Sequence, residues 1–291
     1  MTVRQIAVLL VFVFSLSVAA VAQPGYAAEV KHWRVAHEAE FTADDGWLTI
    51  AGLFWLKDGV NTVGAGDKYD VALTDNFKQG KFGEIIFANG SVTLKVAPSV
   101  DAVADGKPVT TVELVSDTKQ IVVQTGSQSF FVIKRGDRYG VRLRDTRNAA
   151  RTAFTGMKWY PVDRKYRIIA DLEAYAEPKD VDVPNVLGGS FKMKSPGILR
   201  FTLGGKQYTL QPVIEDDKLF IIFRDLTYKS TTYGAGRFLY ADAAKNGKVI
   251  LDFNRSENPP CAFTAFATCP LPPKQNRLEI AIPAGEKRYR D

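Results

Sequence analysis

Short runs that alternate apolar and polar residues, separated by turn-forming pairs, fill most of the chain. Runs at 84–87, 92–96 and 130–133 are rich in β-branched and aromatic residues, and Asn89-Gly90 lies between the first two. Alternation places every second side chain on the same face of a strand, and Asn-Gly favours a two-residue hairpin turn. The pattern predicts a mainly β protein, built as an antiparallel β-sandwich or an open barrel.

One segment near the start has a helical period instead. Val30, Trp33, His37 and Phe41 follow one another at spacings of three, four and four residues, which places them on one stripe of a helix. We predict a short N-terminal helix over 29–41 that lies across one end of the sheet. His37 on this apolar stripe is expected to be half-buried, with its hydrogen bonds satisfied.

Further strands are predicted later in the chain. The run 219–223 is apolar throughout, as is typical of a strand buried on both faces. Residues 177–189 contain two prolines and a Gly-Gly pair, which favours a hinge-like connection, but the strand pattern resumes after it. The other predicted strands are 47–56, 121–123, 139–145, 154–160, 166–175 and 197–203.

The first residues have the pattern of an export signal. Arg4 precedes an apolar stretch at 6–18, and small residues suited to a cleavage site end at Ala22. We predict a signal peptide over 1–27, cleaved after Ala22 or Ala27. No later segment is apolar enough to span a bilayer, so a periplasmic or secreted location is expected, with an uncleaved membrane anchor as the alternative.

The remainder, 28–291, is expected to form a single β-rich domain. Lys and Arg total 38 against 32 Asp and Glu, and the resulting charge of +6 is scattered among acids, which argues against nucleic acid as a partner. His32 and His37 are the only histidines, so a Ser-His-Asp triad or a His-rich metal site would have to use the helical segment. We predict no metal and no cofactor, and a small polar or anionic molecule as the partner. The sequence does not indicate the oligomeric state.

The only two cysteines, Cys261 and Cys269, lie eight positions apart. In an exported chain such a pair most simply forms a disulfide. A pair of free thiols, or a half-site for a metal, remains open as the alternative.

Candidate chemistry is densest in the later part of the chain. Alternation in 251–254 brings Asp252 and Asn254 to the same side, at the end of an apolar run. Asp225 follows the buried strand 219–223 in the same way. Asp225 and Asp252 are the candidate catalytic carboxylates, because each interrupts an apolar stretch rather than a run of charges. Glu286 is a third carboxylate, for which a structural role is favoured.

Arginines supply candidate anion-binding groups. Arg142 and Arg144 share one face of the strand 139–145. There the two guanidiniums can bind an anion through bidentate hydrogen bonds, or they can form a row of ion pairs on the surface. The candidate ligand-binding residues are Arg142, Arg144, Arg224, Tyr233, Arg237 and Asn254. The competing interpretation is that these side chains fix loops by hydrogen bonds and touch no ligand.

Several blocks together resemble a known family. They are Asp44-Asp45-Gly46-Trp47-Leu48 with 52–56, 223–227 with 232–237, 252–255 through 258–261 and 269–273, and Ala284-Gly285-Glu286-Lys287. The chain is similar through these blocks to the bacterial domain-of-unknown-function family 1684. The resemblance implies one continuous domain from about Trp33 to Tyr289 and implies no particular activity.

Three functions remain in view. The favoured hypothesis is an exported β protein whose Arg, Asp and Asn side chains form a pocket for a small polar or anionic ligand. A carboxylate-dependent hydrolase that uses the same pocket is the enzymatic alternative, and a structural or partner-binding envelope protein is the non-catalytic one. The sequence alone does not decide whether the protein is an enzyme.

Overall fold

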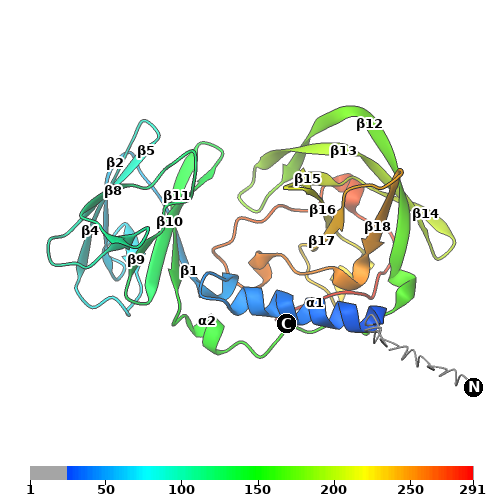
Figure 1. The fold of residues 1–291 in the computed structure, drawn as a ribbon, viewed down its shortest axis with the longest axis horizontal. Helices are drawn as coiled ribbons and strands as arrows, with labels where there is room; N and C mark the ends of the chain where they lie inside the picture. Colours follow the sequence, from blue (N-terminus) through cyan, green and yellow to red (C-terminus); the bar gives the residue numbers. More distant parts are fainter. Residues whose placement is uncertain (1–24, 291) are drawn as a thin grey trace, which may run out of the picture.

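The computed structural model describes residues 25–290, which form two β bodies side by side, and helix α1 (Tyr26–Thr42) runs along the lower side of the C-terminal body toward β1 (Ile50–Trp55) (Figure 1). The predicted mainly β, antiparallel fold with an N-terminal helix is therefore confirmed. The predicted signal peptide lies almost wholly outside the described residues. Between residues 25 and 290, no helix is both long and apolar enough to cross a membrane.

The N-terminal body consists of two sheets. One has the strand order β1-β11-β10-β9-β6-β7 and the other β3-β2-β4-β5-β8. Their bounds are β1 Ile50–Trp55, β2 Gly59–Ala65, β3 Val71–Leu73, β4 Lys81–Ala88, β5 Ser91–Val96, β6 Val103–Ala104, β7 Lys107–Pro108, β8 Thr111–Glu113, β9 Val123–Thr125, β10 Gln128–Arg135 and β11 Arg138–Asp145. Neighbouring strands are antiparallel except β2 and β3.

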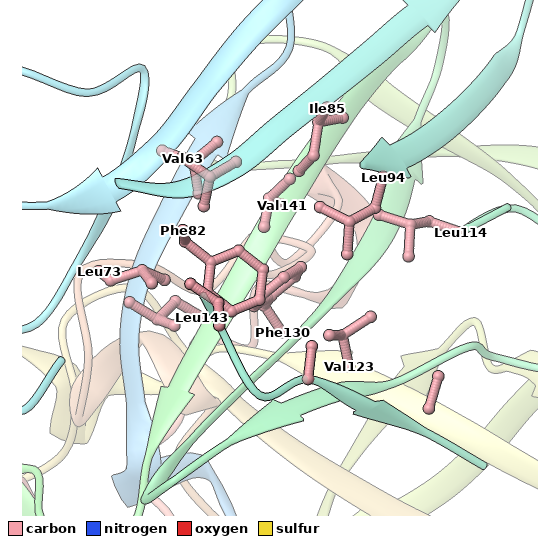
Figure 2. Close-up of a cluster of buried hydrophobic side chains, with 14 of the residues drawn as sticks. Val63, Leu73, Phe82, Ile85, Leu94, Leu114, Val123, Phe130, Val141 and Leu143 are labelled. Atoms are coloured by element: carbon pink, nitrogen blue, oxygen red, sulfur yellow. The ribbon is translucent and has the colours of Figure 1, made fainter. Parts of the chain in front are cut away.

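A core of alternating apolar side chains joins these two sheets. Figure 2 shows Phe82 of β4 against Phe130 and Leu143 of β10 and β11, all of them fully buried. The rings of Phe82 and Phe130 meet edge to face with centroids 5.4 Å apart. The Asn89-Gly90 hairpin between β4 and β5 is confirmed, and both of its turn residues have positive φ, as a type I′ turn requires.

The C-terminal body begins with two long strands and has its own core. Its sheets have the orders β14-β13-β12-β18 and β15-β16-β17. The bounds are β12 Arg167–Pro184, β13 Ser190–Leu203, β14 Lys206–Leu210, β15 Val213–Glu215, β16 Lys218–Phe223, β17 Arg237–Asp242 and β18 Lys248–Asp252. Leu219 to Phe223 are buried without exception, as the apolar run 219–223 predicted. The single-domain assignment stays a prediction, although each body has a separate apolar cluster.

Several predicted elements are wrong in detail. Residues 154–160 form no strand beyond an isolated bridge at Trp159, because this segment packs against α1 instead of joining a sheet. Residues 177–184 are no hinge, since β12 continues through them after a register shift and the turn follows at Asn185. Residues 47–49 form a 3-10 turn before β1, and β9 begins at the end of the predicted strand 121–123.

Helix α1 is held by contacts to distant parts of the chain. Arg34 donates to the carbonyls of Tyr160 and Asn254, and Trp159 donates its indole N–H to Glu38. The ring of Phe41 packs on Phe263 at 4.7 Å. These contacts fix the helix beside the C-terminal body, where its other face borders a cleft. Short helical turns complete the fold at α2 Ala149–Thr152, η1 Trp47–Thr49, η2 Arg164–Tyr166, η3 Leu226–Lys229, η4 Phe253–Arg255, η5 Pro260–Ala262 and η6 Lys274–Asn276.

Candidate functional site

Asp225 and Arg237 form a buried ion pair inside the C-terminal body. Arg237 Nη2 lies 3.0 Å from Asp225 Oδ1, and both side chains are almost fully buried. Asp225 also accepts from Thr227 and from the backbone N–H of Ile282, while Arg237 donates to the carbonyls of Ile282 and Ala284. This pair therefore ties η3 and β17 to the C-terminal segment, and neither residue lines a described cavity.

Asp252 and Asn254 are joined to each other and to α1. The Tyr26 hydroxyl donates to Asp252 at 2.7 Å, and Asn254 Nδ2 lies 2.9 Å from the same hydroxyl oxygen. Asn254 is fully buried and also exchanges hydrogen bonds with the backbone of Asp163. Burial and the Asp252 hydrogen bond raise the pKa of Tyr26. Asp252 lines a cleft beside α1, whereas Asn254 does not.

The other predicted ligand residues are dispersed. Arg142 and Arg144 share the outer face of β11, over Trp47 and Phe131 respectively. Arg224 stacks on Tyr228 with 4.2 Å between its guanidinium carbon and the ring centroid. Tyr233 donates to the carbonyl of Cys261 at 3.3 Å. The eight candidate residues thus fall into separate groups with their own partners, and among them only Asp252 lines the cleft.

Cys261 and Cys269 form a disulfide, as predicted. The bridge closes a short loop beside β13, where Cys269 also accepts a hydrogen bond from the backbone N–H of Cys261. The loop carries Phe263, which packs on α1, and Thr268, to which Arg135 donates. The disulfide therefore stiffens a loop that contacts both α1 and the N-terminal body.

Replacing both cysteines, Cys261→Ala with Cys269→Ala, is expected to lower the free energy of unfolding by roughly 2.5 kcal/mol, from the entropy of closing so short a loop. Urea denaturation of the double variant against wild type measures the change. A double variant that unfolds at the wild-type midpoint would show that the bridge adds no stability.

A cleft with a volume of about 1040 Å³ lies between α1 and the outer face of β12, β18 and β17. Trp33, Phe41 and Trp47 form its aromatic wall, and Ile169 and Ile250 lie exposed on its floor. Charged side chains of both signs surround it, namely Glu29, Glu40, Asp45, Arg167, Lys218, Asp242, Lys245, Lys248, Asp252 and Arg255. An apolar floor with a charged rim suits a polar molecule that also has an apolar part.

Glu257 projects into this cleft from the segment that follows η4. The backbones of Glu257 and of Phe238 in β17 exchange two hydrogen bonds, each N–H donating to the other residue's carbonyl, and these bonds fix the position of Glu257. Its carboxylate oxygen lies 3.4 Å from His37 Nδ1. Burial, helped by Glu286 and Glu40, raises the pKa of Glu257 to about 8, and burial lowers the pKa of His37 to about 4. At neutral pH the two groups therefore meet as a protonated acid and a neutral imidazole.

Glu286 lies beside Glu257 in a different environment. It is fully buried and accepts two hydrogen bonds of 2.7 Å from Asn258, one from the backbone and one from the side-chain amide. Burial raises the pKa of Glu286, and the Asn258 bonds oppose this rise. Asn258 donates two N–H groups to Glu286, whereas no described residue donates a hydrogen bond to the Glu257 carboxyl, so a negative charge is better stabilised on Glu286 than on Glu257.

A second cavity of about 470 Å³ adjoins the cleft. Phe41, Trp47, Tyr240 and Glu257 line both cavities, so the two spaces meet at Glu257. The further wall of the second cavity comes from the β10–β11 turn, β13 and the disulfide loop, with Lys134, Arg135, Phe191, Met193, Thr268 and Cys269 among its residues. The cavity therefore lies between the N-terminal and C-terminal bodies.

Sequence reasoning missed Glu257 and the partner role of His37. Glu257 is the one carboxylate between Asn254 and Pro259, inside a block that the sequence did single out, but its approach to α1 has no local signal. His37 is buried rather than half-buried as predicted, and its Nε2 has no hydrogen-bond partner within residues 25–290, so the prediction that its hydrogen bonds are satisfied was wrong. Among these residues there is also no group of three or more metal-ligating side chains.

Fold and cleft together define a mainly β protein in which helix α1 forms one side of an aromatic-walled cleft. Residues 152–287 match the family described as "Protein of unknown function (DUF1684)", and this part of the chain belongs to that family. Glu257 and β17 lie inside the matched region, and α1 lies outside it. The bacterial origin implied by the resemblance is not shown by this match.

The chain is also similar to solved structures. Among them is the solution NMR structure of the uncharacterized protein from gene locus rrnAC0354 of Haloarcula marismortui, with 30% sequence identity and a TM-score of 0.40. The similarity covers 47% of this chain and 78% of that chain. No curated protein matches the chain.

Proposed function

We propose that this is an exported protein that binds a small polar organic molecule in the cleft between α1 and β12, β17 and β18. The observation that carries the proposal is the Glu257 carboxyl, which lines the cleft beside the aromatic wall and to which no residue between 25 and 290 other than His37, at 3.4 Å, brings a charged partner. Natural sites for small molecules combine apolar walls with a few polar groups that fix orientation. The predicted signal peptide and the disulfide support an oxidising compartment, either the periplasm or the exterior.

Protonated Glu257 would act as a hydrogen-bond donor to the ligand. A neutral carboxyl in a poorly solvated site donates to a carbonyl, hydroxyl or ether oxygen more readily than a carboxylate, which only accepts. Neighbouring Tyr240 is engaged with Glu215, to which its hydroxyl donates at 2.8 Å. Glu257 thus lies at the junction of the two cavities with His37 Nδ1 3.4 Å away, and in this proposal its carboxyl turns from His37 to an oxygen atom of the ligand.

A thermal-shift screen of small polar metabolites tests the proposal. Ligands that bind wild type are expected to lose their shift in Ile169→Trp, because Ile169 is exposed on the cleft floor and the larger ring fills it. Ile214→Trp is the matched control, since Ile214 is exposed but lines neither cavity. Shifts that persist undiminished in Ile169→Trp would contradict a ligand site in the cleft.

A hydrolase is the second candidate, favoured by the unequal environments of Glu257 and Glu286. Glu257 would give its proton to the leaving oxygen as a C–O bond breaks. Water would add to the carbon and lose its proton to Asp252, which lines the same cleft. Glu257→Gln would then keep ligand binding and lose turnover, whereas a pure binding protein shows no turnover in either form.

A further inference from the structure

The smaller cavity, with a volume of about 470 Å³, has walls made mostly of aromatic side chains. These side chains come from segments far apart in the sequence, namely α1, η1, the start of β13 and the neighbouring strands β16 and β17. The six rings are Phe41, Trp47, Phe191, Phe220, Phe238 and Tyr240, and Met193 adds a thioether. A cavity of this volume is large enough to hold the apolar end of a small organic molecule.

The rings on β16 and β17 are already fixed in position. Phe220 and Tyr240 stack with their centroids 4.7 Å apart, and Phe238 meets Phe220 edge to face at 4.8 Å. The Tyr240 hydroxyl donates to Glu215 at 2.8 Å, which holds this ring in its orientation. Because this wall is formed before binding, a ligand that contacts it loses little free energy to the ordering of side chains.

The cationic side chains of the smaller cavity are engaged with other parts of the protein. Arg135 Nε donates to Thr268 at 2.9 Å, and Arg135 Nη1 donates to the carbonyl of Lys134 at 2.8 Å. Lys134 Nζ lies 5.1 Å from the ring centroid of Tyr139. The surface that this cavity offers to a ligand is therefore mainly apolar and aromatic.

The smaller cavity opens to the cleft at Glu257. Phe41, Trp47 and Tyr240 line both spaces together with this carboxyl. A ligand oxygen at Glu257 therefore places the adjoining atoms of the ligand at the opening of the aromatic-walled cavity. Aromatic walls favour an aromatic ring over a saturated group of the same size, because rings gain edge-to-face and offset contacts with one another. The sulfur of Met193 adds a favourable contact with a ring.

From this arrangement we infer that the smaller cavity binds an aromatic ring, and that the ligand of the cleft is an aromatic compound with an oxygen atom next to its ring. The inference rests on the proposed function, because it names the chemical class of the molecule held at Glu257. The ring contacts Phe220 and Met193, and the oxygen atom accepts the hydrogen bond from Glu257.

Methionine-methyl NMR with phenol and cyclohexanol tests the inference. The two probes share one skeleton and one hydroxyl and differ in aromaticity. Met193 lines the smaller cavity, whereas Met157 lies in a separate apolar cluster and lines neither cavity. In protein labelled with ¹³C at its methionine methyl groups, phenol is expected to shift the Met193 signal saturably, with a Kd on the order of 1–10 mM. The Met157 signal is expected to stay in place, and cyclohexanol to bind at least about threefold more weakly than phenol.

Met193→Trp provides a second measurement, because the larger ring fills the cavity. Saturation transfer from the protein to phenol is expected in wild type and to fall to background in this variant. Ile214→Trp, which adds the same ring at an exposed position outside both cavities, is expected to behave as wild type does. An unmoved Met193 signal, equal affinity for cyclohexanol, or undiminished saturation transfer in Met193→Trp overturns the inference.

Ile169→Trp separates this inference from the proposed function, since Ile169 lines the cleft but not the smaller cavity. If phenol shifts the Met193 signal in wild type and in Ile169→Trp while no compound of the metabolite screen binds, the ring site stands and the cleft ligand fails. If the screen finds a cleft ligand and phenol leaves the Met193 signal unmoved, the cleft ligand stands and the inference of an aromatic ring fails.

Discussion

Asp225→Ala is expected to lower the free energy of unfolding by about 3–5 kcal/mol, one of the two largest effects that the structure implies. The substitution leaves Arg237 buried without its counter-charge, and it removes the acceptor for Thr227 and for the backbone N–H of Ile282. Removing one partner of a buried ion pair costs much more than the pair itself contributes, because the remaining charge stays desolvated.

Urea denaturation of wild type and Asp225→Ala measures this loss. Asp171→Ala is the control, since Asp171 and Lys248 form an ion pair in which both side chains are more than half exposed. That control is expected to stay within about 1 kcal/mol of wild type. An Asp225→Ala protein as stable as Asp171→Ala would mean that Arg237 finds solvent or another acceptor, and that the buried pair is not a structural anchor.

Glu257→Gln is expected to make the protein more stable at pH 8.5 by up to about 4 kcal/mol, and to have little effect near pH 4.5. The raised pKa of Glu257 means that the folded protein holds this proton more tightly than the unfolded chain. The stability that this bound proton contributes is fully present below the pKa that Glu257 has in the unfolded chain. It is lost as the pH rises through about 8, the pKa of Glu257 in the folded protein. Glutamine stays neutral, so the variant escapes this loss. Glu286 shares the titration, which makes the figure an upper bound.

Chemical denaturation of both proteins between pH 4.5 and 8.5 tests the sign as well as the size. The groups that face Glu257 are His37, Glu286 and Glu40, and they are unchanged in the variant. Glu29→Gln, which removes an acid from the exposed rim of the cleft, is expected to follow the wild-type curve. Parallel curves for wild type and Glu257→Gln would show that Glu257 is ionised and solvated at neutral pH.

Local patterns predicted the fold well because strands and turns depend on near neighbours. The alternation in 139–145 separates core residues Val141 and Leu143 from Arg142 and Arg144, as in β11. The helical stripe with His37 and Phe41 corresponds to α1. Predictions failed where tertiary contacts override local preference, as at 154–160, which packs against the helix rather than pairing as a strand.

The candidate site was harder to predict because its parts come from distant segments. A carboxylate that ends an apolar strand looks the same in sequence whether it meets a ligand or an arginine, and Asp225 meets Arg237. Asp252 likewise meets the hydroxyl of Tyr26, far away in the chain. The environment that raises the pKa of Glu257 forms only in the folded chain, where α1 places His37 beside Glu257 and Asn258 donates its hydrogen bonds to Glu286. No residue spacing in the sequence encodes these approaches.

A crystal structure with the strongest ligand from the metabolite screen tests the binding site most directly. We expect ligand density between α1 and β17, with an oxygen atom within hydrogen-bond distance of the Glu257 carboxyl and an apolar part against Trp33 or Trp47. Density on another surface, with the cleft filled only by water, would contradict the assignment of the cleft as the ligand site.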